Sequence, residues 1–496
     1  MGEQVYLGID LGAESGRVIA AAFDGQKVRL DELHRFRNGP IDLNNSLRWD
    51  VIGLWQGIRE GLGQAAEKYG SKIVSCGVDT WGVDYVLLSK SDEILGMPFN
   101  HRDERTRGMQ AQAVSRVGKD RIFAETGTQF MEINTLYQLM AARQKTPDML
   151  DAADRFLMMP DFFNWCLCGS KVAEFTNATT TQFVNPKTRD WSADLLRDLD
   201  LPVEIFPQIV APGTSLGQLR TEVAEAAGLG RIDVIAPATH DTGSAVAAVP
   251  TTVDRPKFAY ISSGTWSLFG VEVDHAIVSP QALALNMTNE GGVDDTYRLL
   301  KNVMGLWLVQ ELRRSFEKRG GPISYEHLVH VAQDADPFRS LINPNANRFL
   351  APKDMPTEIQ EFCRETNQPV PESEGALVRC ALESLALKYR SVLAGLEELT
   401  GVATEVIHVV GGGGKNALLN RMTASACRRP VIAGPDEATV LGNVLMQARS
   451  RGEIAGLTDL RQIVANSADV RTFEPSEPEK WDDAYGRFDE LCKKTS

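Results

Sequence analysis

Two segments far apart in the sequence share the same order of strand, small polar turn and strand. In the first, an apolar run at residues 5–11 precedes a glycine-rich turn and a second run at residues 17–23. In the second, residues 257–261 run into Ser262-Ser263-Gly264-Thr265 and then into residues 266–273. One hydrophobic core supports about 250–300 residues, and the chain has 496. The repeated opening therefore predicts two domains of mixed α/β structure.

The connection between the two halves is predicted near Pro250 and Pro256, which interrupt regular structure. We accordingly predict an N-terminal domain at residues 1–249, a C-terminal domain at 257–450 and a tail at 451–496. The tail should end in a docking helix, because it carries large apolar residues on one face: Trp481, Tyr485, Phe488 and Leu491.

Other segments have the periodicity of regular elements. Further strands are expected at residues 27–36, 72–78 and 406–410, and Gly401 should end a long helix. Three helices follow from apolar residues at helical spacing: Val51, Leu54, Trp55, Ile58 and Leu62; Val303, Leu306, Trp307, Leu312 and Phe316; and Leu377, Leu382, Leu385, Tyr389, Val392, Leu396 and Leu399.

The charge balance narrows the classes of partner. The chain has 52 basic and 66 acidic residues and a net charge of −14. Such a balance argues against a nucleic-acid partner, which usually requires a basic face. An acidic enzyme can still bind a nucleotide where backbone amides and Mg²⁺ meet the phosphates. No apolar run approaches the roughly 18 residues of a membrane-spanning helix, so no membrane association is expected.

The cysteines and the first residues indicate the cytoplasm. Seven scattered cysteines are typical of reduced thiols. Cys166 and Cys168 form a C-x-C that we interpret as buried thiols rather than a metal site, and the sequence leaves pairing of Cys363 with Cys380 open. The first residues show no secretory signal, and Tyr6 replaces the hydroxyl residue that myristoylation of Met1-Gly2 would need.

The first motif with chemical meaning is GIDLGAESGR at residues 8–17. Small residues between two strands allow backbone N–H groups to approach an anion closely. Asp10 ends the first strand, and its carboxylate can share that anion only through a cation, most simply Mg²⁺. The alternative is a glycine-rich hairpin without a ligand.

Two further turns suit a nucleotide. YISSGTWS at residues 260–267 opens the second half and could close on phosphates. The glycine run at 411–414 continues into Lys415 and Asn416, but it is not a P-loop, because that motif needs glycine where Val409 stands and a hydroxyl residue where Asn416 stands. Glycines followed by Asn416 and Asn420 suit a flat adenine with amides nearby.

A possible general base follows the apolar run 234–236. In ATHDTG at residues 238–243, Asp241 stands at a strand-to-turn junction. A carboxylate of ordinary pKa, about 3.9, is ionised at pH 7 and ready to accept a hydroxyl proton. The alternative is that Asp241 caps the helix that follows.

The segment DTWGVDY at residues 79–85 suits a sugar. Asp79 and Asp84 offer acceptors for hydroxyl groups, and the Trp81 indole offers a face for C–H surface. A metal pair is the alternative, but no histidine or third carboxylate lies nearby in the sequence.

Taken together, these motifs resemble the FGGY carbohydrate kinases, which share the actin-like ATPase fold. The resemblance extends from Leu7 to about Asn443. Its distinctive stretches are GIDLGAESGRV (8–18), DTWGVDYVLL (79–88), HRDERT (101–106), TNATTTQ (176–182), THDTGSAV (239–246), YISSGTWSLFG (260–270), NEGG (289–292), KNVMGLWLVQ (301–310) and VVGGGGKN (409–416).

The resemblance implies a fold of two RNase-H-like domains with a catalytic cleft between them, and it implies roles for individual residues. Asp241 would be the catalytic base, and Asp10 would hold Mg²⁺ through water. The ATP contacts would be Ala13, Glu14, Ser15, Gly16, Arg17, Thr265, Gln310 and Gly412. The sugar site would be lined by Gly82, His240, Asp241, Thr242 and Asn302.

Within the family, the resemblance implies ATP-dependent phosphorylation of L-rhamnulose at O1 in rhamnose catabolism. Gln138 stands where many family members carry lysine, as in the branch that acts on this ketose. The alternatives are a kinase of fuculose, xylulose or ribulose, an actin-like ATPase without a sugar, and a catalytically inactive sugar sensor. His240-Asp241 and the Trp81 segment argue against an ATPase without a sugar, and the retained Asp241 argues against a sensor.

Overall fold

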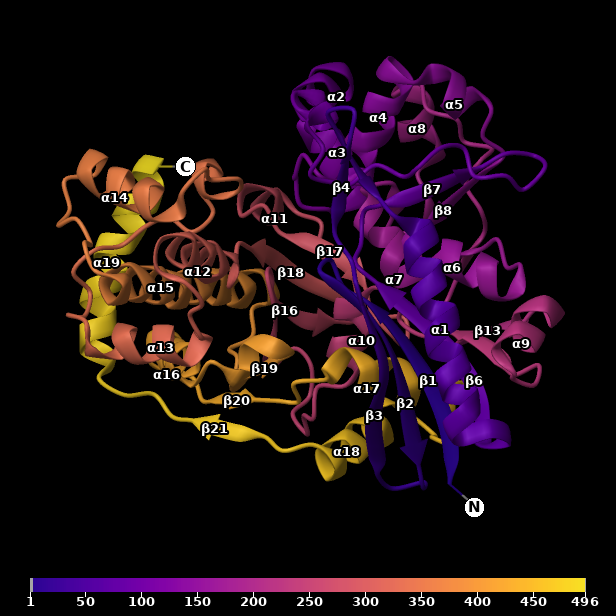
Figure 1. The fold of residues 1–496 in the computed structure, drawn as a ribbon. Helices are drawn as coiled ribbons and strands as arrows, with labels where there is room; N and C mark the ends of the chain where they lie inside the picture. The colour runs from indigo at the N-terminus through magenta and orange to yellow at the C-terminus, as the bar shows by residue number, and fades with distance from the viewer. Residues whose placement is uncertain (1–2, 496) are drawn as a thin grey trace. The chain divides into compact units, whose positions relative to one another are not determined.

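The structure is a computed structural model that describes residues 3–495, so Met1-Gly2, on which the myristoylation prediction depends, lie outside it. The chain divides into two compact units. Unit 1 comprises Met1–Thr252, Glu272–Leu299 and Ala438–Ala468, and unit 2 comprises Val253–Val271, Leu300–Glu437 and Asp469–Ser496. Within residues 3–495, no helix combines the length and the apolarity needed to cross a membrane. Both units contain sheets and helices, so the predicted mixed α/β class is confirmed (Figure 1).

Unit 1 is built on a six-stranded sheet. Its order is β13-β14-β6-β1-β2-β3. The central strands β14, β6 and β1 are parallel, and β13, β2 and β3 pair antiparallel to their neighbours. The bounds are β1 (Gln4–Leu11), β2 (Ser15–Phe23), β3 (Val28–Arg37), β6 (Ile73–Thr80), β13 (Thr214–Gln218) and β14 (Asp233–Ala236). The strands predicted at residues 5–11, 17–23, 27–36 and 72–78 are therefore confirmed.

Two helices cover the two faces of this sheet. On one face, Gly61 of α1 (Val51–Tyr69) lies so close to β2 that a Cβ there would come within 2.4 Å of the Val18 side chain. On the other face, Gly8 of β1 lies against α17 (Ala438–Ser450), where a Cβ would be 3.3 Å from Val440. Ile9 pairs with Val18, and neighbouring residues point to opposite faces of a strand. The helices α1 and α17 therefore lie on opposite sides of the sheet.

The remaining elements of unit 1 are short. The strands are β4 (Pro40–Leu43), β5 (Ser46–Trp49), β7 (Tyr85–Leu88), β8 (Arg155–Met158), β9 (Ala173–Glu174), β10 (Val184–Asn185), β11 (Asp190–Trp191), β12 (Ile209–Val210) and β17 (Thr288–Gly291). The helices are α2 (Met109–Val117), α3 (Lys119–Thr126), α4 (Thr135–Lys145), α5 (Pro147–Asp151), α6 (Met159–Cys168), α7 (Phe175–Ala178), α8 (Ala193–Asp198), α9 (Thr221–Ala227), α10 (Asp241–Ala247), α11 (Pro280–Ala284) and α18 (Leu457–Ser467).

Unit 2 has its own sheet, in which β16, β15, β19, β20 and β21 are neighbours in that order. The hairpin of β15 (Phe258–Ser263) and β16 (Ser267–Val273) was predicted from the second strand–turn–strand motif and is confirmed. The strand β18 (Tyr297–Val303) has Tyr297, Arg298 and Leu299 in unit 1 and its remaining residues in unit 2. The other strands of unit 2 are β19 (Val406–Val410), β20 (Val431–Ala433) and β21 (Arg471–Phe473). The central strand β19 is buried throughout, as its apolar sequence predicts.

The helices of unit 2 correct one prediction. Val303 was assigned to a helix, but it ends β18, and α12 (Trp307–Gly320) begins only after Gly305. At Gly305 a Cβ would lie 2.3 Å from Ser267 Oγ, so this turn must stay narrow. The other helices are α13 (Tyr325–Asp334), α14 (Met355–Glu365), α15 (Glu374–Thr400), α16 (Ala417–Cys427) and α19 (Pro478–Thr495).

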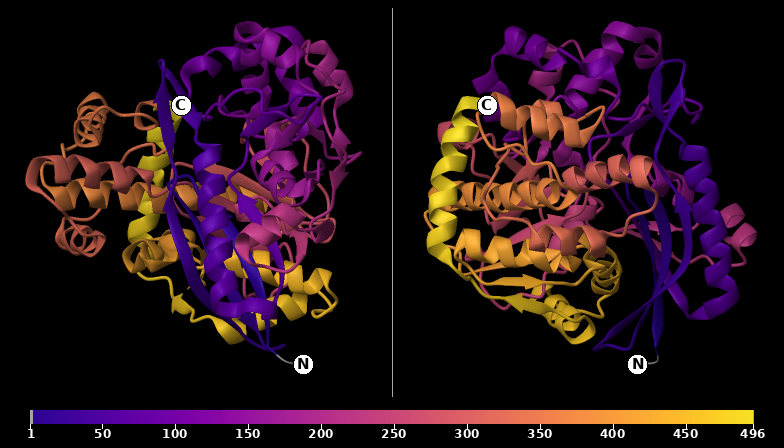
Figure 2. Two further views of the ribbon diagram at one scale, coloured as in Figure 1. Left: turned by 45° about the vertical axis from the view of Figure 1, so that its right-hand side comes forward. Right: turned by 60° about the vertical axis from the view of Figure 1, so that its left-hand side comes forward.

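Two expected helix features in unit 2 are confirmed. The helix α15 ends at Gly401, whose φ of 67° is the left-handed conformation expected at a C-cap. The C-terminal helix α19 buries Trp481 and Phe488. It packs against α15 and α16, and Figure 2 shows it (yellow) lying beside them.

The seven cysteines are all free thiols, as expected for a reduced chain. Cys166 and Cys168 lie on α6, and no cluster of ligands able to hold a metal is found among residues 3–495. Cys363 and Cys380, whose pairing the sequence left open, are buried and in hydrogen-bond contact without a disulfide.

Candidate functional site

The parallel strands of unit 1 bring three carboxylates to one edge of the sheet. Asp10 of β1 lies opposite Asp79 of β6 in the register. Thr80 bridges to His240, so that Asp241 follows directly beside the end of β6. Ligands of open α/β sheets bind outside the carboxyl ends of the strands. The structure thus places a candidate base and a candidate metal-holding residue where such a sheet binds ligands.

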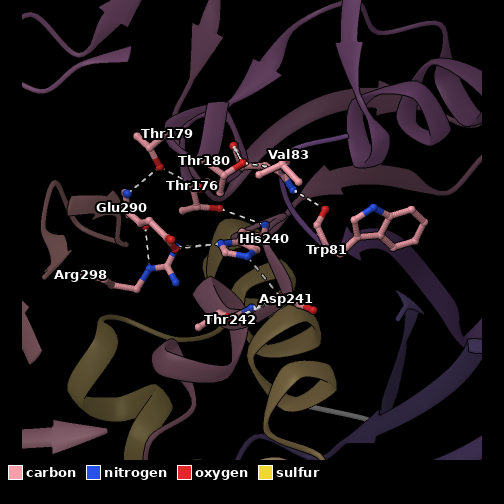
Figure 3. A network of polar contacts seen from close by, with 12 residues as sticks. Trp81, Val83, Thr176, Thr179, Thr180, His240, Asp241, Thr242, Glu290 and Arg298 are labelled. Carbon is pink, nitrogen blue, oxygen red and sulfur yellow. Dashed lines mark hydrogen bonds and ion pairs between the residues drawn. The ribbon is translucent and has the colours of Figure 1, made fainter. Parts of the chain in front are cut away.

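Asp241 is the first residue of α10, and its carboxylate is oriented by its neighbours (Figure 3). The Oδ1 atom accepts hydrogen bonds from Thr242 N at 2.6 Å and Thr242 Oγ1 at 3.2 Å. His240 Nε2 lies 3.4 Å from the same oxygen. The side chain is about one-third exposed. The N-cap of the helix is His240, so the alternative in which Asp241 caps α10 is not the observed geometry.

The three carboxylates influence each other's ionisation. Burial raises the pKa of Asp241, the charge of His240 opposes that rise, and the charge of Asp10 adds to it. Burial, followed by the charge of Asp10, raises the pKa of Asp79 well above its usual range. Asp79 Oδ2 accepts a hydrogen bond of 2.6 Å from Asn443 on α17, and its Oδ1 is buried with no hydrogen-bond partner among residues 3–495. Acidic groups gathered in this way favour a cation beside them.

These residues fit Mg²⁺ held through water better than direct coordination. The described residues contain no set of three or more ligand groups placed to hold a metal ion. Arg17 pairs with Asp10, and its guanidinium lies 3.7 Å from Glu32. Magnesium keeps several of its waters and often uses only one or two carboxylates. The orphaned oxygen of Asp79 beside Asp10 is consistent with that form of binding.

Gly82 lies in a tight turn after β6, next to the segment at Thr180. A Cβ on Gly82 would be 2.9 Å from the Thr180 hydroxyl oxygen. Val83 has a φ of 66°, an unfavourable conformation for a β-branched residue. Its N–H donates to Thr180 Oγ1 at 3.0 Å, and its carbonyl accepts from Thr135 Oγ1 at 2.6 Å. Strain held by surrounding bonds is common at functional sites.

The structure corrects the interpretation of Asp84 and Trp81 as sugar contacts. Asp84 is fully buried, and its Oδ2 accepts bonds from Trp49 Nε1 at 2.7 Å and Trp81 Nε1 at 2.9 Å. His101 Nδ1 lies 2.7 Å from the same atom, and Gln138 Nε2 donates to Oδ1 at 3.0 Å. The Trp81 indole packs on Trp49, with ring centroids 4.2 Å apart. Asp84 therefore joins the segments that carry Trp49, Trp81 and His101 from within the core, and no sequence spacing indicates these partners.

His240 is held from the strand side by a buried ion pair that the sequence interpretation missed. Its Nδ1 lies 3.2 Å from Glu290 Oε2 on β17 and 3.2 Å from Arg298 Nη2 on β18. Glu290 and Arg298 are themselves 3.2 Å apart. The backbone N–H of His240 donates to Thr176 Oγ1. Glu290 belongs to the NEGG stretch of the family resemblance, and that stretch is the only sequence signal for it.

The predicted phosphate hairpin is the turn between β1 and β2. Gly12 N donates to Ser15 O at 2.9 Å, and Ala13 and Glu14 at the tip are exposed. Asn38, which directly follows β3, stabilises this turn, because its Nδ2 donates to Gly12 O at 2.7 Å. Gly16 has a packing reason as well, since a Cβ there would come within 2.3 Å of Phe36. Arg17 is already paired with Asp10.

Unit 2 brings its own candidate residues together. The turn between β15 and β16 contains Thr265, whose carbonyl accepts a bond of 3.0 Å from Trp307 N at the start of α12. One helical turn further lies Gln310, whose buried side-chain oxygen has no hydrogen-bond partner in the part of the chain that the structure describes. A buried unpaired acceptor is unfavourable and suits a ligand that donates to it.

The glycine run lies against this same turn. A Cβ on Gly413 would be 1.9 Å from Ser263 Oγ, so the run must approach the hairpin without side chains. Gly412 is exposed and has open space around its Cβ position. The expected amide contacts to adenine are corrected in part: Asn416 Oδ1 caps α16 by accepting from Leu419 N, and Asn420 is buried and donates to Gly414 O at 2.9 Å.

Asn302, the remaining predicted sugar contact, lies on β18 in unit 2. Its carbonyl accepts a hydrogen bond of 3.3 Å from Asn345 Nδ2. Asn345 also accepts from Met304 N at 3.1 Å, so it fixes the turn that follows β18. Sequence reasoning missed Asn345, because a single asparagine in a loop carries no distinguishing pattern.

Relatives of known classification match nearly the whole chain. Residues 5–248 match the N-terminal domain, and residues 259–451 the C-terminal domain, of the FGGY family of carbohydrate kinases. A rhamnulokinase of Bacteroides thetaiotaomicron is 45% identical over 98% of this chain and 99% of its own length. A rhamnulokinase of Pectobacterium atrosepticum is 43% identical over 98% of this chain and 96% of its own.

Solved structures agree on the fold. A xylulose kinase from Lactobacillus acidophilus superposes with a TM-score of 0.82 at 17% identity, covering 99% of this chain and 97% of that one. A xylulose kinase from Rhodospirillum rubrum gives a TM-score of 0.80 at 18% identity, covering 99% of both chains. At such identities the likeness concerns the fold alone. Because both domain models match and the relatives match over nearly their full length, the chain belongs to the FGGY family of carbohydrate kinases.

Proposed function

We propose that this protein transfers the γ-phosphate of ATP to O1 of L-rhamnulose, as a rhamnulokinase of L-rhamnose catabolism. The observation that carries the chemistry is Asp241, a partly exposed carboxylate at the carboxyl end of the parallel strands, oriented by Thr242 and His240. The full-length rhamnulokinase relatives support the choice of sugar within the family.

In the proposed mechanism, the sugar lies beside Gly82, His240, Thr242 and Asn302, and its hydroxyl donates to Asp241. Asp241 takes the proton as the oxygen attacks the γ-phosphorus, and ADP leaves. Phosphoryl transfer depends on positioning and charge neutralisation, together with one proton acceptor. Because burial raises the pKa of Asp241, its conjugate acid is a weaker acid than a free carboxyl, and the carboxylate is a correspondingly better base.

The nucleotide contacts that we propose come from both phosphate turns. They are Ala13, Glu14, Ser15, Gly16, Arg17, Thr265, Gln310 and Gly412. Mg²⁺ bound to ATP would neutralise developing phosphate charge, and Asp10 would hold its water shell. The pairing of Asp10 with Arg17 holds the carboxylate in place for that role.

We retain as proposals the division at residues 1–249, 257–450 and 451–496 and a cytoplasmic location. The family matches at 5–248 and 259–451 support the first two ranges. The free thiols support a reducing compartment.

A ketose panel tests the substrate. We expect Mg²⁺-ATP-dependent phosphorylation of L-rhamnulose with a kcat/KM at least tenfold above that for fuculose, xylulose or ribulose, a difference of about 1.4 kcal/mol in transition-state binding. ADP release is measured for each sugar, with a no-sugar control for ATPase activity. A preference of tenfold or more for xylulose would reject L-rhamnulose but keep the kinase, and equal ATP turnover without sugar would reject both.

Gly412→Val tests the nucleotide site. The structure leaves open space at the Gly412 Cβ, so the valine should not disturb the fold. A branched side chain there should block close approach of the base, and we expect ATP affinity to fall at least about tenfold, or 1.4 kcal/mol. Calorimetry of ATP and of sugar binding checks this, with Gly412→Ala as the smaller control. Unaltered ATP affinity in a folded Gly412→Val protein would exclude Gly412 from the site.

A further inference from the structure

Oxygen Oδ1 of Asp241 is occupied, and this makes the two oxygens of the base unequal. Every donor that the structure describes at this carboxylate lies on Oδ1: Thr242 N, Thr242 Oγ1 and His240 Nε2. An oxygen that already accepts hydrogen bonds is a poorer proton acceptor than its free twin. The geometry therefore leaves Oδ2 to receive the hydroxyl proton.

The proton on His240 Nε2 decides whether this arrangement is favourable. An imidazole nitrogen without a proton would turn a lone pair toward Oδ1, whereas Nε2–H donates to it. Nε2 carries the proton when Nδ1 accepts from Arg298 Nη2, which lies 3.2 Å away. Glu290 Oε2 lies 3.2 Å from both Nδ1 and that guanidinium, and so holds Arg298 beside the ring.

Glu290 and Arg298 form a buried pair beside the His240 ring. Glu290 is 5% exposed, and Arg298 is fully buried. Burial opposes ionisation of Glu290, yet the charges of His240 and Arg298 together lower the pKa of its carboxyl. Asp241 faces the ring from its own helix, and Thr176 meets only its backbone. Two carboxylates against one guanidinium thus surround the imidazole, and Asp10 and Asp79 add negative charge near Asp241.

We propose that Glu290 is a positioning residue for the kinase reaction: with Arg298 it holds His240 so that Nε2–H points at Asp241 Oδ1, which leaves Oδ2 as the proton acceptor. The inference rests on the proposed function, because it concerns the base of the same reaction. Glu290 acts through His240 and need not touch either substrate. In Figure 3 the side chains form one line from Arg298 and Glu290 through His240 to Asp241.

The first test is Glu290→Gln, which keeps the shape and removes the charge. Arg298 then loses the carboxylate that orients it, so its bond to Nδ1 weakens and Nε2–H is no longer held toward Asp241 Oδ1. We expect kcat to fall about 10- to 100-fold, less than the roughly 10²–10⁴ that the general base itself contributes, while both KM values change less than about threefold. Because the ionised Asp241 then loses a hydrogen-bond donor, the acidic limb of kcat/KM should move to higher pH.

Glu290→Asp and Glu272→Gln are the matched controls. Glu290→Asp keeps the charge, so its acidic limb should stay at the wild-type pH even if kcat falls. Glu272 forms a buried ion pair with Arg461 elsewhere in unit 1, so Glu272→Gln reports the general effect of breaking such a pair. We expect wild-type kcat and pH dependence from it. If Glu290→Gln fails to fold because Arg298 is left unpaired, Glu290→Gln/Arg298→Gln removes both charges and should show the same shift.

A measurement without sugar separates this inference from the proposed function. Nitrogen-15 NMR of the seven histidine rings, with His240 assigned by its loss in His240→Asn, reports which ring nitrogen carries the proton. We expect Nε2–H in the wild type and a mixture of the two ring tautomers in Glu290→Gln. A neutral ring protonated only on Nδ1, or an unchanged kcat and acidic limb in Glu290→Gln, would overturn the inference. A wild-type protein inactive on every ketose would instead reject the proposed function, and the NMR result would still decide where the proton lies.

Discussion

Asp241→Asn is expected to lower kcat at least about a hundredfold, because a positioned general base contributes about 10²–10⁴ in rate, or roughly 3–5 kcal/mol. The asparagine oxygen can still accept from Thr242 N and Thr242 Oγ1, so the local fold should be kept. The amide cannot take a proton, and both substrates should still bind. Steady-state kinetics and calorimetry on one preparation measure these effects together.

The control separates catalysis from stability. If Asp241 only stabilised the start of α10, its loss would cost about 1 kcal/mol of stability, as for a helix cap, and the folded protein would remain active. Thr242→Ala serves as the matched variant, because it removes the hydroxyl donor to Asp241 and leaves the base. Near-normal kcat in Asp241→Asn with a lowered melting temperature would falsify the catalytic role.

Asp84→Ala is expected to destabilise unit 1 by about 4 kcal/mol, because it leaves the indole N–H groups of Trp49 and Trp81 and the His101 ring without their buried acceptor, at about 1–3 kcal/mol for each orphaned group. Thermal unfolding followed by tryptophan fluorescence measures the loss, since both indoles contact Asp84 directly. Sugar turnover should fall with it, because the Gly82–Val83 turn precedes Asp84.

Asp194→Ala is the matched control for this stability effect. Asp194 is also in unit 1, but its side chain is 83% exposed and its pairing with Arg197 is a surface ion pair. Such pairs contribute about 0–1 kcal/mol, so the melting temperature should hardly change. Equal stability of Asp84→Ala and Asp194→Ala would show that the buried carboxylate is not a structural centre of the unit.

Local pattern was sufficient for most of the elements and for placing Asp241, the proposed base, at the end of a strand. Apolar runs bounded by turn residues located β1, β2, β15, β16 and β19, since period and turn chemistry are properties of neighbouring residues. The same logic found Gly401 as a C-cap. The prediction of a helix at Val303 was wrong, because Val303 ends β18. The strand and the helix α12 are separated only by a narrow turn at Gly305, so their apolar residues form one continuous pattern in the sequence.

The sequence also could not show the discontinuity of the units. Residues 272–299 and 438–468 belong to unit 1 although they follow the start of unit 2 in the chain. Packing assigns them: Asn443 of α17 bonds Asp79 on β6, and Glu290 lies beside His240. Dividing the chain by sequence position cannot reveal contacts between residues that are hundreds of positions apart.

What the sequence by itself determined was the two-part α/β architecture and the family, and it supplied the residues that we propose for proton transfer. What only the tertiary structure decided was which polar groups are buried against each other. Asp84 was interpreted as a sugar ligand, but it is enclosed by Trp49, Trp81 and His101. No sequence pattern pointed to a role for Glu290, yet its carboxylate lies 3.2 Å from the His240 ring. The physical reason is that periodicity reports which face of an element is buried, whereas a hydrogen-bond partner is fixed by the packing of elements remote in sequence.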